Sequence, residues 1–452
     1  MYKKNITDKM TNSSKSQKKF WNLLDKLSDK RTKTSTFVTR NSLLRHFKTL
    51  LNSTKSNTIP SECTEPGQLD FLITSEELKK ASECLKPGKS VGADNLNNEM
   101  ISCLLNVNPN LVLKLFNCIL NGGGLLPEWI IAYIVPIHKC GSKSDPSNYR
   151  GISLLSCLSK LFLSILQNRL LKYSADHNLL AATQLGFRKG NRTSDAHIII
   201  RNIIDKYCHK KGSKIYSCFI DLSKAFDTIP RDILLKKLLE RGINGKFFNI
   251  IRGIYSNDLA CIKVDGKCTE TFAINQGVRQ GCVLSPLLFN IFMADLAKKL
   301  TTVSDKLEIQ EQGVNSLFWA DDIVLLGKSA KNLTEMIKMV SEYCKENKLT
   351  INCKKTKCLI FNKTGRHLRE KFYLNDAELE NVREYKYLGF IFTPSGEITS
   401  GLKDLRDRGL KAFYSLKNKM GESFNRNITS SIVLFESTIK PILLYASDFW
   451  GD

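Results

Sequence analysis

Two apolar segments that carry aspartates constrain the fold of this chain more than any other feature. Residues 215–221 read IYSCFID, a run of β-forming residues that predicts a buried strand ending at Asp221. Residues 317–326 read LFWADDIVLL, which places Asp321 and Asp322 between two apolar strands in the manner of a tight hairpin. The pattern therefore predicts a hairpin tip whose two carboxylates lie beside Asp221.

Helical patterns alternate with such strands along most of the chain, and this mixture predicts an α+β fold. The dipeptide Asp265-Gly266 predicts a further hairpin within residues 261–276. Helices are expected at residues 20–27, from Leu333 to Asn347, and, as a basic helical stretch, from Ile398 onward. Three others have recognisable ends: one starts with Ser75 as N-cap and ends at Pro87 and Gly88, and one runs from Ile233 to Arg241 after Thr228 and Pro230. The third has Ser285 as N-cap and Pro286 in its first position.

Three carboxylates held on rigid strands suit a particular chemistry. Phosphoryl transfer from a nucleoside triphosphate commonly uses two divalent cations about 4 Å apart, and Mg²⁺ prefers oxygen ligands. An Asp-Asp pair at a turn is by itself more often ordinary turn chemistry. Only the surrounding motifs can favour a metal site over that simpler interpretation.

The charge of the chain indicates a polyanionic partner. Lysine and arginine total 68 against 44 acidic residues, which gives a net charge of +24 and a pI near 9.4. The 14 cysteines include no C-x-x-C pair, so a zinc site is not expected and reduced thiols are. No apolar segment approaches the roughly 20 residues of a membrane helix, and the N-terminus shows no secretion signal.

Three motifs carry a family resemblance. FIDLSKAFDTI, GVRQGCVLSPLLFNIFMADL and FWADDIVLL resemble, in this order, core motifs of reverse transcriptases from non-LTR (LINE-type) retrotransposons. Three upstream segments resemble their finger motifs: LKPGKSVGADNLNNEMI, the block PEWIIAYIVPIHKCG…NYRGISLLSCLSKLF, and QLGFRKGNRTSDAHIII. Downstream, LTINCKKTKCLIF and YKYLGFIF resemble their last palm motifs. The resemblance spans roughly residues 85 to 450.

The resemblance implies a right-hand polymerase with fingers, an antiparallel-sheet palm that has helices on one face, and a partial helical thumb. We expect a basic N-terminal extension with one helix at residues 1–68, fingers and palm at 69–390, and a truncated thumb at 391–452. The implied activity is RNA-directed DNA polymerisation with two Mg²⁺ ions, or Mn²⁺ in their place. The implied partners are an RNA template, a DNA primer, the RNA:DNA hybrid and deoxynucleoside triphosphates.

The resemblance also implies roles for individual residues. Asp221, Asp321 and Asp322 correspond to the metal-binding triad, with Asp322 the weakest ligand. The other implied roles are an aromatic steric gate at Phe226, triphosphate binding by Lys139 and Arg150, template and nucleotide contact at Gln280 and Gly281, a general acid at Lys355, and a primer grip at Tyr387, Leu388 and Gly389. Asp227 is expected to be structural.

Each of these roles has a simpler alternative. An ordinary core phenylalanine is the less favoured interpretation of Phe226, Lys139 is nearly as well explained as a solvated loop lysine, and Gln280-Gly281 also suits the entry to a helix, which is compatible with the implied role. Lys355 lies among other lysines, which favours a solvated basic strand edge. Trp319 stands where most members of the family carry Tyr or Phe, so rate or fidelity is expected to differ.

Two other functions stay open from the sequence. The chain could be an inactive, nucleic-acid-binding remnant of a mobile element, because members of the family continue past the equivalent of its last residues. An intron maturase or a telomerase-like enzyme would share the palm, although the finger motifs match less well. The family resemblance places the protein inside the cell, in the nucleus or in a cytoplasmic ribonucleoprotein.

Overall fold

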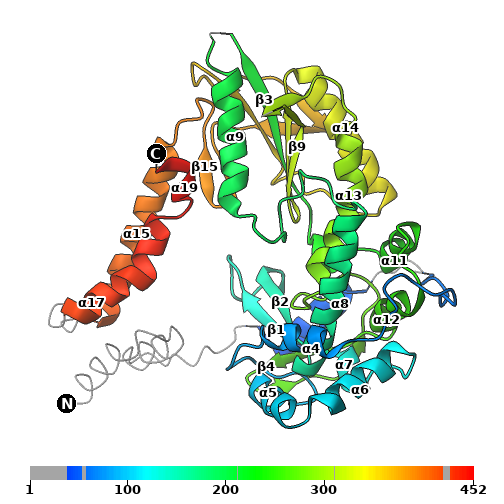
Figure 1. Cartoon of the computed structure of the whole chain (residues 1–452). Coiled ribbons are helices and arrows are strands. Elements are labelled where there is room, and N and C mark those ends of the chain that lie inside the picture. The colour runs from blue at the N-terminus through cyan, green and yellow to red at the C-terminus, as the bar shows by residue number, and fades with distance from the viewer. Residues whose placement is uncertain (1–37, 53–57, 211, 310, 421–427, 452) are drawn as a thin grey trace.

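A computed structural model of the chain describes residues 38–52, 58–210, 212–309, 311–420 and 428–451. Two lobes, each built around a sheet, and a helical arm make up the described chain (Figure 1). Helix α13 (Ser285–Leu300) runs between the two lobes. The helix predicted at residues 20–27 lies outside the described residues.

The lower lobe is organised by a five-stranded sheet. Its order is β2 (Tyr149–Leu154), β1 (Ile131–His138), β4 (Leu259–Val264) and β5 (Lys267–Cys268), and β6 (Phe272–Ala273) also pairs with β4. The β4–β5 turn is the predicted Asp265-Gly266 hairpin, and both turn residues have the positive φ, 51° and 77°, that this dipeptide tolerates. That prediction is confirmed.

Helices cover this sheet and form the rest of the lower lobe. Its helices are α3 (Arg40–Leu50), α4 (Ser75–Ser82), α5 (Asn98–Val107), α6 (Pro109–Leu120), α7 (Pro127–Ile130), α8 (Cys157–Asp176), α11 (Arg231–Glu240) and α12 (Gly245–Ser256). Among the described helices none is by itself long and apolar enough to cross a membrane, while α5 and α6, bent by 108° to one another, pass that test only as a pair.

The upper lobe is organised by a six-stranded sheet. The strand order is β12 (Phe372–Leu374), β13 (Ala377–Asn381), β11 (Lys357–Asn362), β3 (Lys214–Asp221), β10 (Asp322–Gly327) and β9 (Ser316–Trp319). All neighbouring strands are antiparallel except β11 and β13, which are parallel. The sheet is therefore almost wholly of the antiparallel kind expected.

Both faces of this sheet are covered, which corrects the expectation of helices on one face. Alternate residues of β3 enter two different apolar clusters: Cys218 and Ile220 enter the cluster shared with α13 and α14 (Ala330–Glu346), and Ile215 and Phe219 enter the other. The second cluster is closed by α9 (Thr193–Tyr207) and by the hairpin of β14 (Tyr385–Tyr387) and β15 (Phe390–Phe392). A strand buried on both faces has no polar alternation, and β3 shows none.

Several helix boundaries differ from the predictions. The largest difference is at the end of α4, which stops at Ser82, short of the end predicted at Pro87 and Gly88, and α14 begins at Ala330, three residues before the predicted Leu333. Thr74, not Ser75, is the N-cap of α4, because its hydroxyl accepts from Glu77 while the Glu77 carboxylate accepts from the Thr74 amide. Ser285 is the first residue of α13 and Leu284 its cap. The helix predicted from Ile233 begins two residues earlier, where Pro230 directly precedes Arg231.

Helices also lie near the two ends of the described chain. Helix α3 was not predicted, yet it buries Leu43 and Phe47 in the core of the lower lobe. At the other end, α15 (Thr399–Met420) forms the arm and confirms the helical stretch expected there. The domain boundaries at residues 68 and 390 remain predictions.

Candidate active site

The three predicted aspartates come together at one edge of the upper sheet. Asp221 ends β3 and is the direct Cα partner of Asp322, the first residue of β10. Asp322 also pairs with Trp319 across the hairpin, so that Ala320 and Asp321 form its two-residue turn, with Ala320 at φ +57°. The predicted hairpin and its placement beside Asp221 are both confirmed.

Their surroundings leave the aspartates with excess negative charge. Burial, followed by repulsion from Asp321 and Asp221, raises the pKa of Asp322 to about 6. Burial also raises the pKa of Asp321, and Asp221 adds to that effect. A bound cation would relieve this repulsion, so the residues present fit a divalent metal ion.

Oxygen donors of this kind suit a hard cation such as Mg²⁺. In the part of the chain that the structure describes, however, no three Asp, Glu, His or Cys side chains are gathered into a preassembled metal site. The fit therefore rests on the chemistry and charge of the carboxylates.

A basic residue already approaches this group. Lys355 Nζ lies 3.4 Å from Asp221 Oδ2, and its side chain is 60% exposed. Its charge lowers the pKa of Asp322 against the larger effects of burial and repulsion. The lysine expected to act as a general acid is thus at the site.

A hydrogen-bonded relay links the lower lobe to the segment after β3. Arg150 Nε donates to Gln280 Oε1 at 2.8 Å, and Gln280 Nε2 donates to Asp227 Oδ1 at 2.6 Å. Burial raises the pKa of Asp227 to about 6, although the hydrogen bond from Gln280 lowers it. Asp227, expected to be structural, therefore contacts a residue expected to meet the nucleotide.

The two predicted triphosphate ligands flank one loop. Arg150 belongs to β2, and Lys139 closes the β1–β2 connection with an amide that donates to the Asn148 carbonyl at 2.8 Å. Both side chains are exposed, and both charges lower the pKa of Asp321. Both are therefore close enough to the aspartates for their charges to act on Asp321.

Phe226 lies in a stack of aromatic rings. It sits in the short helix α10 (Ala225–Thr228), and its ring is stacked on Phe289 with centroids 4.4 Å apart and planes 7° apart. Phe187 meets the same ring edge-on at 6.0 Å. Phe226 is only partly buried, as a residue that meets a substrate must be.

Gly281 is required by its neighbours. It has φ +117°, and a Cβ there would come within 2.5 Å of the Ser153 carbonyl oxygen. The amide of Ser153 in turn donates to the Gln280 carbonyl at 2.7 Å. Close approach to β2 thus explains the glycine, where the sequence suggested close approach to a base pair.

The predicted primer-grip residues are held tightly by the protein. Tyr387 is 3% exposed and its ring meets Phe219, so the ring cannot press on a strand at the surface. The backbone carbonyls of all three predicted residues accept hydrogen bonds from the protein: Tyr387 from His197, Leu388 from Tyr445 and Gly389 from Arg408. The Tyr387 ring therefore lies beneath the sheet and not at the surface, and the primer-grip role of the three residues stays a prediction.

The segment that holds this site is similar to a known protein family. The family model described as "Reverse transcriptase (RNA-dependent DNA polymerase)" matches residues 137–392, which include the aspartates, Arg150 and Gln280. The chain belongs to the reverse transcriptase family.

Its relatives are proteins of mobile elements. The reverse transcriptase chain is 28% identical over 390 residues to the probable RNA-directed DNA polymerase from transposon BS of Drosophila melanogaster, a match that covers 84% of this chain and 42% of that protein. It is 28% identical over 440 residues to the RNA-directed DNA polymerase from mobile element jockey of Drosophila funebris, with 93% and 46% covered. The chain thus spans less than half the length of these relatives. Among solved structures, apo telomerase from Candida tropicalis aligns with a TM-score of 0.42 at 15% identity, over 66% of this chain and 53% of that one.

Sequence reasoning missed several residues that build this reverse transcriptase site. A buried triad joins the lobe to the relay: Asp258 accepts from Arg231 Nη2 at 2.5 Å and from Arg279 Nε at 2.8 Å, and Arg279 directly precedes Gln280. The position of Arg279 inside GVRQG was the one available signal. Asp258 and the rings of Phe187 and Phe289 gave none, because their contacts are distant in sequence.

Proposed function

We propose that this chain is an RNA-directed DNA polymerase that adds deoxynucleotides to a primer 3′-hydroxyl and releases pyrophosphate. The observation that carries the proposal is the convergence of Asp221, Asp321 and Asp322 at one sheet edge in a chain of this family. The lower lobe would be the fingers, the upper lobe the palm, and α15 part of the thumb. The domain limits at residues 68 and 390 are part of the proposal.

Reverse transcriptases generally use divalent metal ions, and the three aspartates are the residues that would hold them here. We propose two Mg²⁺ ions, with Mn²⁺ as a substitute. When bound, such ions activate a hydroxyl and stabilise the charge on a leaving pyrophosphate. The raised pKa of Asp322 supports this role, because repulsion among carboxylates is what a cation would remove.

Other residues of the chain would bind and orient the substrates. The guanidinium of Arg150 and the ammonium of Lys139 would neutralise triphosphate charge, Arg150 with its orientation set by Gln280. Phe226 would exclude a ribose 2′-hydroxyl by contact. Lys355 would donate a proton to the leaving pyrophosphate.

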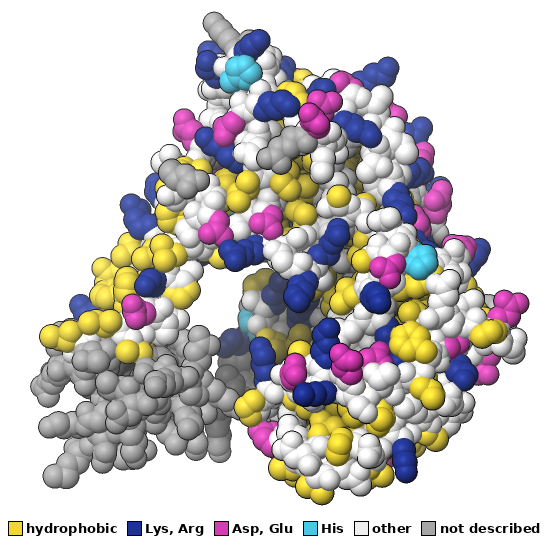
Figure 2. All heavy atoms as spheres, viewed as in Figure 1, with side chains coloured by type: hydrophobic (Ala, Val, Ile, Leu, Met, Phe, Trp, Pro, Cys, Tyr) yellow, Lys and Arg dark blue, Asp and Glu magenta, His cyan; other side chains and the backbone are white. Residues whose placement is uncertain are grey.

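The partners in this proposal are an RNA template, a DNA primer and deoxynucleoside triphosphates. Figure 2 shows basic side chains gathered around the opening between the lobes and the arm, a suitable surface for a nucleic-acid backbone. Copying into a chromosome would take place in the nucleus, with a cytoplasmic ribonucleoprotein as the form that carries the RNA. The remnant hypothesis is not favoured, because the aspartates, the relay and the aromatic stack are all in place.

Primer extension tests the proposal. The purified chain is given a poly(rA)/oligo(dT) hybrid, dTTP and Mg²⁺, beside the double variant Asp321→Asn, Asp322→Asn. Extension by the wild type that is lost in the variant supports the polymerase. Binding of the hybrid by both proteins with a steep salt dependence, and extension by neither, would instead identify an inactive nucleic-acid-binding protein.

A further inference from the structure

The ring of Phe226 is in contact with two other aromatic rings, those of Phe289 and Phe187. Helix α10, which carries it, has only four residues and begins after Lys224 at φ +49°. The segment around it is tethered to other parts of the chain, since the Val278 amide donates to the Phe226 carbonyl and the Gly277 amide to the Ile229 carbonyl, both at 2.8 Å. A side chain on so short an element keeps a fixed position only if its ring is packed in place.

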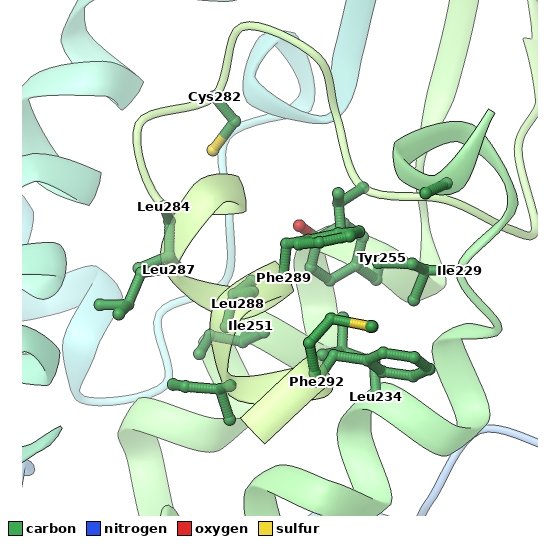
Figure 3. Packing of buried hydrophobic residues seen from close by; sticks show 14 of the residues in the cluster. Ile229, Leu234, Ile251, Tyr255, Cys282, Leu284, Leu287, Leu288, Phe289 and Phe292 are labelled. Carbon is green, nitrogen blue, oxygen red and sulfur yellow. The ribbon is translucent and has the colours of Figure 1, made fainter. Parts of the chain in front are cut away.

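Phe289 supplies a rigid support for that ring. It lies in the first half of α13, is fully buried, and stacks almost parallel on Phe226. Figure 3 shows Phe289 among Tyr255, Leu288 and Ile229, and Phe292 pointing away toward Leu234. Because Phe289 is fully buried in a close-packed core, it limits how far the Phe226 ring can sink toward that core.

Phe187 confines the same ring from a second direction at an energetic cost. Its φ is +58°, a conformation rare for a bulky residue and typically found at functional sites, and its side chain is 53% exposed. Gly186, just before it, packs so closely on the aspartate hairpin that a Cβ would lie 2.5 Å from the Ala320 nitrogen.

One residue of α13 joins these two supports. Asn290, the neighbour of Phe289, donates from Nδ2 to the Gly186 carbonyl at 2.8 Å, and its own carbonyl accepts from Gln184 Nε2 at 2.8 Å. The segment that carries Phe187 is therefore fixed to the helix that carries Phe289. The three rings form one connected unit beside the aspartates.

We propose that sugar selection depends on this three-ring unit, with Phe289 and Phe187 as positioning residues that hold the Phe226 gate at the distance where it excludes a 2′-hydroxyl. The inference rests on the proposed polymerase function. Steric exclusion depends steeply on distance, so a gate that can retreat by a fraction of an ångström loses selectivity while the aspartates stay intact. The substrate class rejected is the ribonucleoside triphosphates.

Single-nucleotide incorporation opposite one template cytosine, in a defined RNA template with an annealed DNA primer, tests this, with kcat and KM measured for dGTP and for GTP. Phe226→Val, Phe289→Leu and Phe187→Gly should each raise the relative efficiency with GTP, the last two by about tenfold, mainly through KM for GTP. Phe292→Leu is the matched control, since Phe292 is equally buried in α13 but lies outside the stack, and its ratio should stay at the wild-type value. Glycine suits the positive φ of residue 187, so that variant should fold even if Phe289→Leu does not.

A double variant separates action through the gate from general loosening. Phe226→Val combined with Phe289→Leu should be no more permissive than Phe226→Val alone, because the support has nothing left to hold. The inference is overturned if Phe226→Val relaxes selection while Phe187→Gly and Phe289→Leu do not, or if Phe226→Val itself has no effect. A wild-type chain that extends no primer would overturn the proposed function, and this inference with it.

Discussion

Gln280 bridges Arg150 and Asp227 through the two ends of one amide, accepting at 2.8 Å from the guanidinium and donating at 2.6 Å to the carboxylate. A carboxylate can only accept, so Asp227 dictates that the amide nitrogen faces it and the amide oxygen faces Arg150. The relay thereby fixes the guanidinium of Arg150, in the lower lobe, to the carboxylate of Asp227 in the segment that follows β3.

Replacing that carboxylate should loosen the orientation of Arg150. In Asp227→Asn the partner amide can donate or accept, so Gln280 is no longer held one way. A charged hydrogen bond contributes about 1.5 kcal/mol, which corresponds to a roughly tenfold rise in KM for the deoxynucleotide with a smaller change in kcat. Steady-state kinetics check this, and Asp232→Asn on neighbouring α11 is the control; equal KM values for the two variants would contradict the prediction.

The requirement for Mg²⁺ should depend on pH. Because the pKa of Asp322 is raised to about 6 by burial and by Asp321 and Asp221, protons compete with the cation below that pH. The Mg²⁺ concentration for half-maximal extension should rise by about threefold between pH 6.5 and 5.5 and change little between pH 7 and 8. Magnesium titrations of extension at these pH values provide the measurement, and a constant requirement would show that Asp322 does not titrate in this range.

Lys355 and Lys354 offer a matched pair for the proton-donor role. Both are exposed, and Lys355 Nζ lies 3.4 Å from Asp221 Oδ2. Among the described residues Lys354 makes no such ion pair with an aspartate of the site. Lys355→Ala should lower kcat by about 100-fold, the lower range for general acid catalysis, and Lys354→Ala by less than about threefold. Similar losses in the two variants would favour a solvated basic strand edge. Stability should be unchanged in both, because exposed ion pairs contribute little.

His197 should make folding stability depend on pH. It is fully buried, Nε2 lies 3.1 Å from the Tyr387 carbonyl oxygen, and burial lowers its pKa to about 4. In the unfolded chain the pKa of this histidine is about 6.5, so as the pH falls through 6.5 the unfolded chain binds a proton that the folded chain does not bind. Stability is therefore full above pH 6.5 and falls as the pH drops from 6.5 to 4, by about 3 kcal/mol in total. Urea unfolding at pH 7 and 5 measures this, and His197→Gln should show a smaller decrease than the wild type.

The site was predictable where its signals were local, and it was missed where they were not. The aspartate hairpin follows from two apolar runs around Asp321 and Asp322, and the structure confirms it. That both faces of the upper sheet are buried could have been predicted, because residues 215–220 show no alternation of polar and apolar residues. The support of Phe226 by Phe289 had no such signal, because α13 is buried on nearly all sides near that ring and no pattern marks the side that meets Phe226. Arg150 and Gln280 meet across 130 positions, a separation that no local pattern covers.

The buried triad of Asp258, Arg231 and Arg279 should contribute strongly to the stability of the lower lobe. Asp258, with its side chain 0% exposed, accepts hydrogen bonds from both Arg231 and Arg279, whose side chains are 1% and 3% exposed. Asp258→Asn would leave two buried guanidinium groups without a counter-charge and should destabilise the fold by about 3 to 5 kcal/mol. Asp265→Asn, at the exposed β4–β5 turn where asparagine tolerates the positive φ, should change stability by less than about 0.5 kcal/mol. Urea unfolding at neutral pH measures both, and because Arg279 leads directly into Gln280, any folded Asp258→Asn protein should also show the raised nucleotide KM of the Asp227 variant. A normal KM in such a protein would mean that the triad stabilises the lobe without orienting the relay.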